Sequence, residues 1–137
     1  MYKRQDIDTT ITPFEAGLGF FVNMDKGDFI GREALSKKNK GTCLFGVTCA
    51  TDTPASGSKV LEDGNVVGHI TAGVPSPTLK LGIGYVRFYE PKEWPGKKLK
   101  LELLNGEIHD CNIVKLPFFD HDKKIVKGID RTIPNKP

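Results

Sequence analysis

A stiff loop at Pro75-Ser76-Pro77 is the sharpest candidate for a binding function in this sequence. Each proline presets its backbone φ angle, so the loop can hold a fixed edge against a flat ligand. A rigid crossover between two strands explains the same residues equally well. Lys80 follows closely, and its ammonium group is a point charge that can neutralise a carboxylate. Pro75, Ser76 and Lys80 are therefore taken as candidate cofactor-binding residues.

A second group of lysines follows near the carboxyl end, at Lys123, Lys124 and Lys127. Each could pair with an anionic ligand, but a solvated surface position is the more ordinary role of a lysine. Lys123 is the first of the three and lies just after the Pro117-Phe118 pair. It is the fourth candidate binding residue.

Residues for catalysis or metal binding do not form a recognisable pattern. Glu15 has a capping role to fill, Asp8 has no paired carboxylate, and the glycines of Gly82-Ile-Gly84 lack the strand-to-helix setting of a phosphate loop. The sequence predicts no catalytic residue.

The histidines and cysteines are also scattered. His69, His109 and His121 show no ligand spacing, so we expect no metal site. The three cysteines form no C-x-x-C pair and fall in predicted strands, where small apolar core residues are expected. They are Cys43, Cys49 and Cys111.

Composition bounds the class of protein. The 137 residues include 38% hydrophobic and 27% charged residues, with a net charge of +3, which suits one globular domain with a remnant of a neighbour. Basic and acidic residues alternate, so nucleic acid binding has little support. No apolar run is long enough to span a membrane. We expect neither nucleic acid nor membrane as a partner, and a cytoplasmic, reducing compartment.

The first 40 residues indicate short elements. Thr12-Pro13-Phe14-Glu15 is a helix-start signal limited to about one turn by the glycines that follow. The aromatic run Leu18–Met24 predicts a buried strand. Asp28 is a candidate N-cap for a helix over Ile30–Lys38. We expect residues 1–40 to be the remnant of a neighbouring domain, and Met1–Gln5 to continue from a longer chain.

From Cys43 onward, short β-type runs recur about every ten residues, which is typical of a barrel or sandwich. Asp63-Gly64 and Asn105-Gly106 predict two-residue type I′ hairpins. Closure of the strands would remove exposed edges. The predicted fold is mainly β (α+β), with a six-stranded antiparallel, jelly-roll-like barrel at residues 41–120 and a flexible tail at 121–137. The predicted strands are Cys43–Ala50, Lys59–Glu62, Val66–Thr71, Gly82–Arg87, Lys98–Leu103 and Ile108–Val114.

Several segments resemble the glycine cleavage T-protein (aminomethyltransferase) superfamily. Asp6–Gly19 and Lys26–Leu35 are similar to the joint between its catalytic and terminal domains. Gly64–Val86 is similar to its glycine hairpin and T-S-G-x-x-S-P-S/T-L strand, although Ala72 stands where serine is common. Leu116–Asp120 resembles the family's Pro-Phe ending. The likeness extends from residue 6 to about residue 124.

The resemblance implies that this chain is the C-terminal portion of a tetrahydrofolate-dependent one-carbon transferase. The N-terminal half, which binds folate, would then be missing. Pro75, Ser76, Lys80 and Lys123 would then contact tetrahydrofolate, and a lipoyl carrier protein or a fused flavin oxidoreductase domain would be a partner. The isolated piece should fold without turnover. Three alternatives stay open: a folate-dependent demethylase or dimethylglycine or sarcosine dehydrogenase domain, a non-catalytic interaction barrel, and a folate-binding relative that maintains iron–sulfur proteins.

Overall fold

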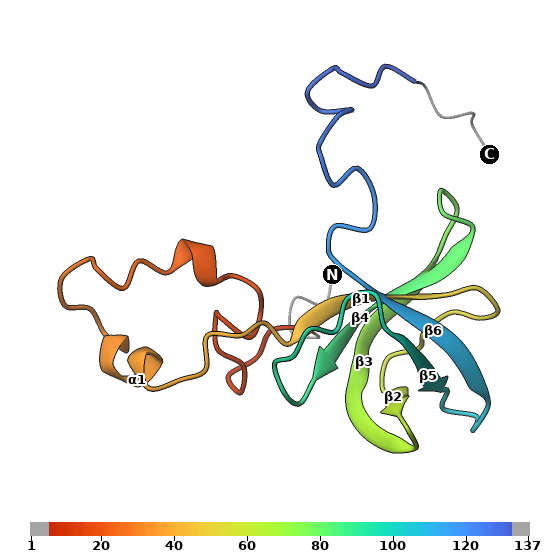
Figure 1. Ribbon diagram of the computed structural model, residues 1–137, viewed down its shortest axis with the longest axis horizontal. Coiled ribbons are helices and arrows are strands. Elements are labelled where there is room, and N and C mark those ends of the chain that lie inside the picture. The colour runs from red at the N-terminus through yellow and green to blue at the C-terminus, as the bar shows by residue number, and fades with distance from the viewer. Residues whose placement is uncertain (1–5, 133–137) are drawn as a thin grey trace.

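The structure is a computed structural model that describes residues 6–132, and the predictions for residues 1–5 and 133–137 lie outside it. Six strands form a closed antiparallel barrel in the order β1-β4-β3-β2-β5-β6 (Figure 1). This confirms the predicted fold class. The strands are β1 (Leu44–Cys49), β2 (Lys59–Glu62), β3 (Asn65–Ser76), β4 (Leu81–Phe88), β5 (Lys98–Glu102) and β6 (Ile108–Val114).

The barrel core is filled by the inward-facing residues of the strands. β4 and β6 alternate between buried and more exposed positions, as expected for strands with one face on a core. Trp94, from the β4–β5 loop, is 1% exposed and stacks on Phe88 with ring centroids 3.9 Å apart. Its indole N–H donates to the Glu90 carbonyl at 3.0 Å, so the polar atom of this buried ring is satisfied. The loop is thereby anchored in the core.

The cysteines are core residues, as predicted. Cys49 and Cys111 face each other across β1 and β6, and both are almost completely buried. Burial raises the pKa of the Cys111 thiol to about 12, so it stays protonated and unreactive at neutral pH. Cys43 is also buried, just before β1.

The two predicted hairpins form, but only one has the predicted turn. Asp63 and Gly64 both have positive φ, as a type I′ turn requires. In the second hairpin, Gly106 has a φ of 85° and donates to the Leu103 carbonyl, while Asn105 does not have a positive φ. The type I′ prediction for Asn105-Gly106 was therefore wrong. A turn over Leu104-Asn105 followed by a glycine in the left-handed region replaces it.

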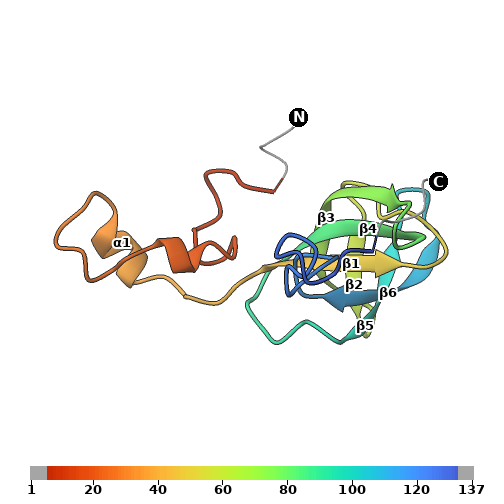
Figure 2. The ribbon, with the colours of Figure 1, turned by 90° about the horizontal axis from the view of Figure 1, so that it is seen from above.

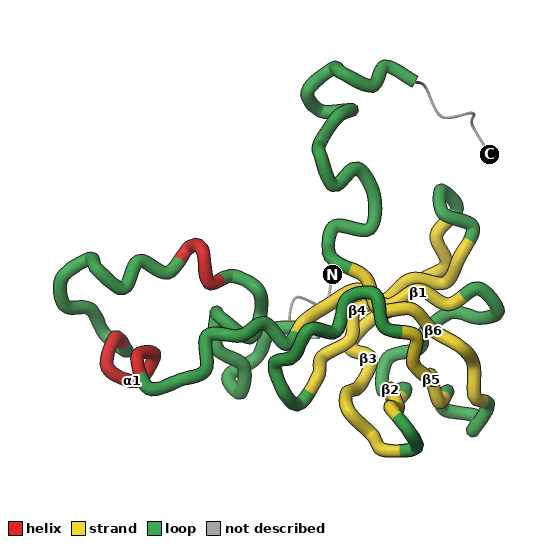
Figure 3. Tube along the Cα trace, in the orientation of Figure 1, coloured by secondary structure: helices red, strands yellow, loops and turns green. Residues whose placement is uncertain are grey.

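Residues 6–42, called the arm, extend away from the barrel and contain almost no regular structure (Figure 2, Figure 3). The capping box is present: the Thr12 amide donates to the Glu15 carboxylate at 2.8 Å, and the Glu15 amide donates to the Thr12 hydroxyl at 3.2 Å. The only α-helix in the described chain is α1 (Arg32–Ser36), shorter than predicted. It begins after Gly31, whose φ is 90°, so the prediction of Asp28 as N-cap was wrong.

The predicted buried strand at Leu18–Met24 was also wrong. These residues contain the 3-10 helix η1 (Gly19–Phe21), and Phe20 and Phe21 are exposed. The aromatic residues suggested burial, but no neighbouring strand or sheet within residues 6–132 lies over them. No described helix is long and apolar enough to cross a bilayer.

Candidate functional site

Three of the four predicted binding residues line one hollow. Pro75, Ser76 and Lys80 meet the loop that follows β1 around a volume of about 340 Å³, here called the hairpin hollow. Its lining is completed by residues of that loop and of the β3–β4 turn: Ala50, Thr51, Asp52, Thr53, Pro77, Leu81 and Gly82. In Figure 1 the β3–β4 hairpin extends from the barrel beside this loop. The structure thus brings these three residues together, and their role in binding a cofactor stays a prediction.

The β3–β4 turn is held by its own hydrogen bonds. The Ser76 hydroxyl accepts the Leu79 amide at 3.2 Å, and the Ser76 carbonyl accepts the Lys80 amide at 2.8 Å. Lys80 has a φ of 54°, which fixes its backbone in the left-handed region. Pro75 lies opposite Gly82 in a part of β3 that pairs only with β4 among the described strands, so its missing N–H leaves no ladder bond unmade.

Glycines let the loop after β1 lie directly on the hairpin. A Cβ atom on Gly73 would lie 1.8 Å from the Pro54 carbonyl oxygen, and one on Gly82 would lie 2.1 Å from that of Asp52. Neither position has room for a side chain. Gly82 therefore marks a close approach of two backbone segments, and this contact forms one wall of the hairpin hollow.

Lys80 is the free cation of the hairpin hollow. Its side chain is exposed, and it makes no ion pair within residues 6–132. Lys123 is also exposed but lies in the segment after β6, and it is absent from the described lining of the hollow. The structure thus groups Pro75, Ser76 and Lys80 and leaves Lys123 apart from them.

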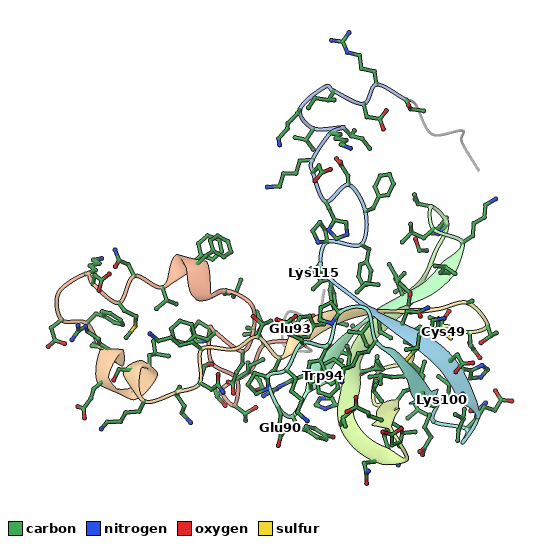
Figure 4. The ribbon with its side chains drawn as sticks, viewed as in Figure 1. Cys49, Glu90, Glu93, Trp94, Lys100 and Lys115 are labelled. Carbon is green, nitrogen blue, oxygen red and sulfur yellow. The ribbon has the colours of Figure 1, made fainter. Side chains whose placement is uncertain are left out.

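A larger hollow, which the sequence did not predict, lies where the arm meets the barrel. This junction hollow has a volume of about 460 Å³. Figure 4 shows Glu93 and Lys115 at this end of the barrel. The lining combines the segment after α1 with the β4–β5 loop: Asn39, Gly41, Thr42, Phe45, Pro91, Lys92, Glu93, Pro95 and Lys115. The paired prolines of that loop were the one signal that could have indicated it.

Arg87 on β4 makes several of the polar contacts that attach the arm to the barrel. Its guanidinium lies 3.3 Å from an Asp8 carboxylate oxygen and donates to the Thr10 hydroxyl at 2.8 Å. Hydrogen bonds from Thr10, with the nearby Arg87 charge, hold the pKa of Asp8 below its usual value. The Cys43 amide also donates to the Glu15 carbonyl at 2.8 Å. Asp8 and Glu15 thus have structural roles.

His69 is half-buried on β3, with its ring centroid 5.8 Å from that of Tyr89. Burial and the neighbouring Arg87 lower its pKa, so the imidazole is neutral at pH 7.

Comparison with known proteins gives a consistent result. A sequence model described as the glycine cleavage T-protein C-terminal barrel domain matches residues 43–120. The aminomethyltransferase of Nostoc sp. is 39% identical over 127 residues, which are 88% of this chain and 33% of that protein. The aminomethyltransferase of Halothermothrix orenii is 40% identical over 119 residues, 82% of this chain and 32% of that protein.

One solved structure supports the same comparison. The glycine cleavage system aminomethyltransferase T from Bartonella henselae matches with a TM-score of 0.67 and 28% sequence identity. The match covers 84% of this chain and 34% of that structure. This chain therefore spans about a third of the length of the relatives it matches.

Proposed function

Because the chain belongs to the glycine cleavage T-protein family through its C-terminal barrel domain, we propose that it is the C-terminal part of a tetrahydrofolate-dependent aminomethyltransferase. The observation that carries the proposal is the continuous match over the arm and the barrel to about a third of named aminomethyltransferases. The remaining two thirds of such a protein would bind most of the folate. The aminomethyl group would arrive on a lipoyl carrier protein.

The exposed apolar face of the arm supports a missing neighbour. Phe20 is 81% exposed, Phe21 is 72% exposed and Ile30 is fully exposed. The two phenylalanine rings contact each other, with centroids 3.9 Å apart, and nothing else in the described chain covers them. Apolar side chains gathered in this way mark a surface that a partner buries. The upstream part of the parent enzyme is the partner we propose.

The hairpin hollow suits one edge of the cofactor rather than all of it. Its volume of about 340 Å³ lies at the lower end of small-molecule sites, and it is open to solvent. Lys80 would attract a folate carboxylate, and Pro75 with Ser76 would form a stiff edge beside it. Lys123, outside the hollow, would act at longer range as a further positive charge. Tetrahydrofolate, when bound, is the acceptor of the one-carbon unit.

In this proposal the barrel contributes by position rather than by proton transfer. The residues around the hairpin hollow would hold the cofactor edge in a fixed orientation and exclude water from the pocket in the upstream half. The described lining of the hollow contains one acid, Asp52, which lies near Glu107 and His109, and we assign it no role in proton transfer. The isolated chain should therefore fold without catalysing transfer.

A domain exchange tests the proposal. The C-terminal third of the Nostoc aminomethyltransferase is replaced by this chain, and tetrahydrofolate-dependent ammonia release is measured. We expect the fused protein to be active, and both this chain and the truncated Nostoc protein to be inactive. Turnover by this chain alone, or a folded but inactive fusion, would contradict the proposal.

Two variants of the fusion locate the surfaces. Replacing both phenylalanines by serine (Phe20→Ser with Phe21→Ser) should weaken the contact between the halves and lower the activity. Lys80→Gln should weaken tetrahydrofolate binding about fivefold, which corresponds to about 1 kcal/mol. Lys98→Gln on β5 is the matched control, because that lysine is exposed and does not line the hollow. Equal effects of the two lysine changes would exclude the proposed role of Lys80.

A further inference from the structure

Three potential metal ligands converge at the barrel rim, where the loop after β1 meets the start of β6. They are Asp52, Glu107 and His109, here called the rim triad. His109 Nε2 lies 3.6 Å from Glu107 Oε2 and 4.0 Å from Asp52 Oδ2. All three ligand atoms lie within 4.8 Å of one another. Residue spacing alone does not indicate this cluster, because Asp52 is distant in the chain from the other two.

The histidine atom that faces the carboxylates is buried and unsatisfied. Nε2 of His109 is inaccessible to solvent and has no hydrogen-bond partner among residues 6–132. The other ring nitrogen, Nδ1, lies 2.8 Å from the Thr51 hydroxyl. That contact fixes the ring orientation, as an outer-shell partner does for a metal-binding histidine. A buried polar atom without a partner requires an explanation.

The second ligand is oriented in a similar way. One oxygen of Asp52, Oδ1, accepts the Thr53 amide at 2.6 Å, while the other oxygen, Oδ2, faces His109. Glu107 lies just before β6, and its amide donates to the Asn105 side chain at 3.0 Å. The atoms that face one another are thus those not used in these local hydrogen bonds.

A direct hydrogen bond does not account for the spacing. The distances of 3.6 and 4.0 Å exceed the 2.7 to 3.2 Å range of N–H···O bonds. In a tetrahedral Zn²⁺ site, two ligand atoms are about 3.4 Å apart when each lies about 2.0 to 2.2 Å from the metal. The separation of His109 and Glu107, 3.6 Å, is close to that value, and Asp52, at 4.0 Å from His109, would move slightly closer when a metal binds. The two carboxylates also give the site a negative charge that suits a divalent cation.

We propose that the rim triad binds one divalent transition-metal ion, with Zn²⁺ as the representative ion. The imidazole nitrogen favours Zn²⁺ over Mg²⁺, which prefers oxygen ligands and retains its waters. Three protein ligands leave a coordination position for water. Bound metal would join the loop after β1 to the β5–β6 hairpin, and would hold Asp52, which also lines the hairpin hollow. The proposal does not depend on the proposed enzyme activity.

Titration of the isolated chain tests it. The chain, without an affinity tag and stripped of metal by a chelator, is titrated with Zn²⁺ in a calorimeter, and Mg²⁺ is titrated in parallel. We expect saturable binding of one Zn²⁺ per chain, and no saturable binding of Mg²⁺. His109→Gln and Asp52→Asn should each weaken Zn²⁺ binding at least about tenfold. Circular dichroism checks that each variant is folded.

The other two histidines provide matched controls. His69→Gln and His121→Gln should leave the affinity for Zn²⁺ within about twofold, because neither residue belongs to the rim triad. If His109→Gln does not fold, Asp52→Asn decides alone, because it leaves the imidazole and its contact with Thr51 in place. Absence of saturable Zn²⁺ binding, unchanged affinity in folded rim variants, or an equal loss in a control would each overturn the proposal.

Discussion

The arm and the barrel differ in how completely they bury their apolar side chains. In the barrel, Val47 and Leu101 are completely buried. In the arm, only Phe14 and Ala16 are buried hydrophobic residues, while Ile30 is fully exposed. The barrel is also joined by a continuous ladder of backbone hydrogen bonds, whereas the arm has two helical segments of a few residues.

This difference indicates which part can fold alone. Burial of apolar side chains supplies most of the stabilisation of a domain, and a closed sheet leaves few backbone groups unpaired. The barrel meets both conditions by itself. The arm meets neither, and depends on Arg87 and on backbone contacts near Cys43 for its position. The two regions should therefore respond differently to the same kind of change.

The largest effect is expected from truncation of Trp94. Trp94→Ala removes the ring stacked on Phe88 and leaves a cavity, so it should lower the free energy of unfolding by about 3 to 5 kcal/mol. Phe20→Ala, the matched change in the arm, should alter it by less than about 0.5 kcal/mol because that ring is exposed. Urea unfolding followed by circular dichroism measures both. Similar losses for the two variants would contradict an autonomous barrel.

A smaller effect is expected from a methyl group added at Gly82. The new Cβ would lie 2.1 Å from the Asp52 carbonyl oxygen, which is backbone and must move. Gly82→Ala should lower stability by about 1 to 3 kcal/mol. In Gly19→Ala, the Cβ would meet the Phe14 side chain at 2.9 Å rather than a backbone atom, so the loss of stability should be smaller. A loss in Gly19→Ala equal to that in Gly82→Ala would show that the arm is as tightly packed as the barrel.

The same contrast explains what could be predicted from sequence. The strands are short β-type runs bounded by turn residues, β5 alternates exposed and buried residues, and the barrel closes within the chain, so local pattern and global fold agree. In the arm, Leu18–Met24 has the composition of a buried strand but lacks its neighbours. An apolar composition indicates that side chains tend to be buried. It does not show whether the surface that buries them belongs to the same chain.

The residues of the candidate sites also differ in whether the sequence alone could bring them together. Pro75, Ser76 and Lys80 are near in sequence, so a single turn brings them together. The rim triad and the junction hollow join segments that are distant in the chain, and only the closed barrel reveals them. Lys123 was selected for its place after Pro117, and sequence order alone could not show that it lies apart from the hairpin hollow.

A more local effect is expected from Arg87→Gln. The change removes the charged contact with Asp8 and the guanidinium contact with Thr10, so amides of residues 6–12 should exchange with solvent faster. Because Asp8 is largely exposed, global stability should fall by less than about 1 kcal/mol. Hydrogen exchange read by mass spectrometry measures this. Lys100→Gln, which breaks the exposed pair with Asp110 on the barrel, is the control and should leave the arm unchanged.

The smallest effect is a detachment of the arm in acid. Hydrogen bonds from Thr10 lower the pKa of Asp8, and the Thr12 amide lowers that of Glu15. A carboxyl group whose folded pKa is depressed stabilises the fold above its unfolded pKa of about 4, and that contribution is lost as pH falls through the lower folded value. Arm amides should therefore lose protection below about pH 4, while the fluorescence of buried Trp94 persists. In Asp8→Asn with Glu15→Gln, arm protection should be low and independent of pH in this range. Simultaneous loss of arm protection and Trp94 fluorescence would mean that arm and barrel unfold as one unit.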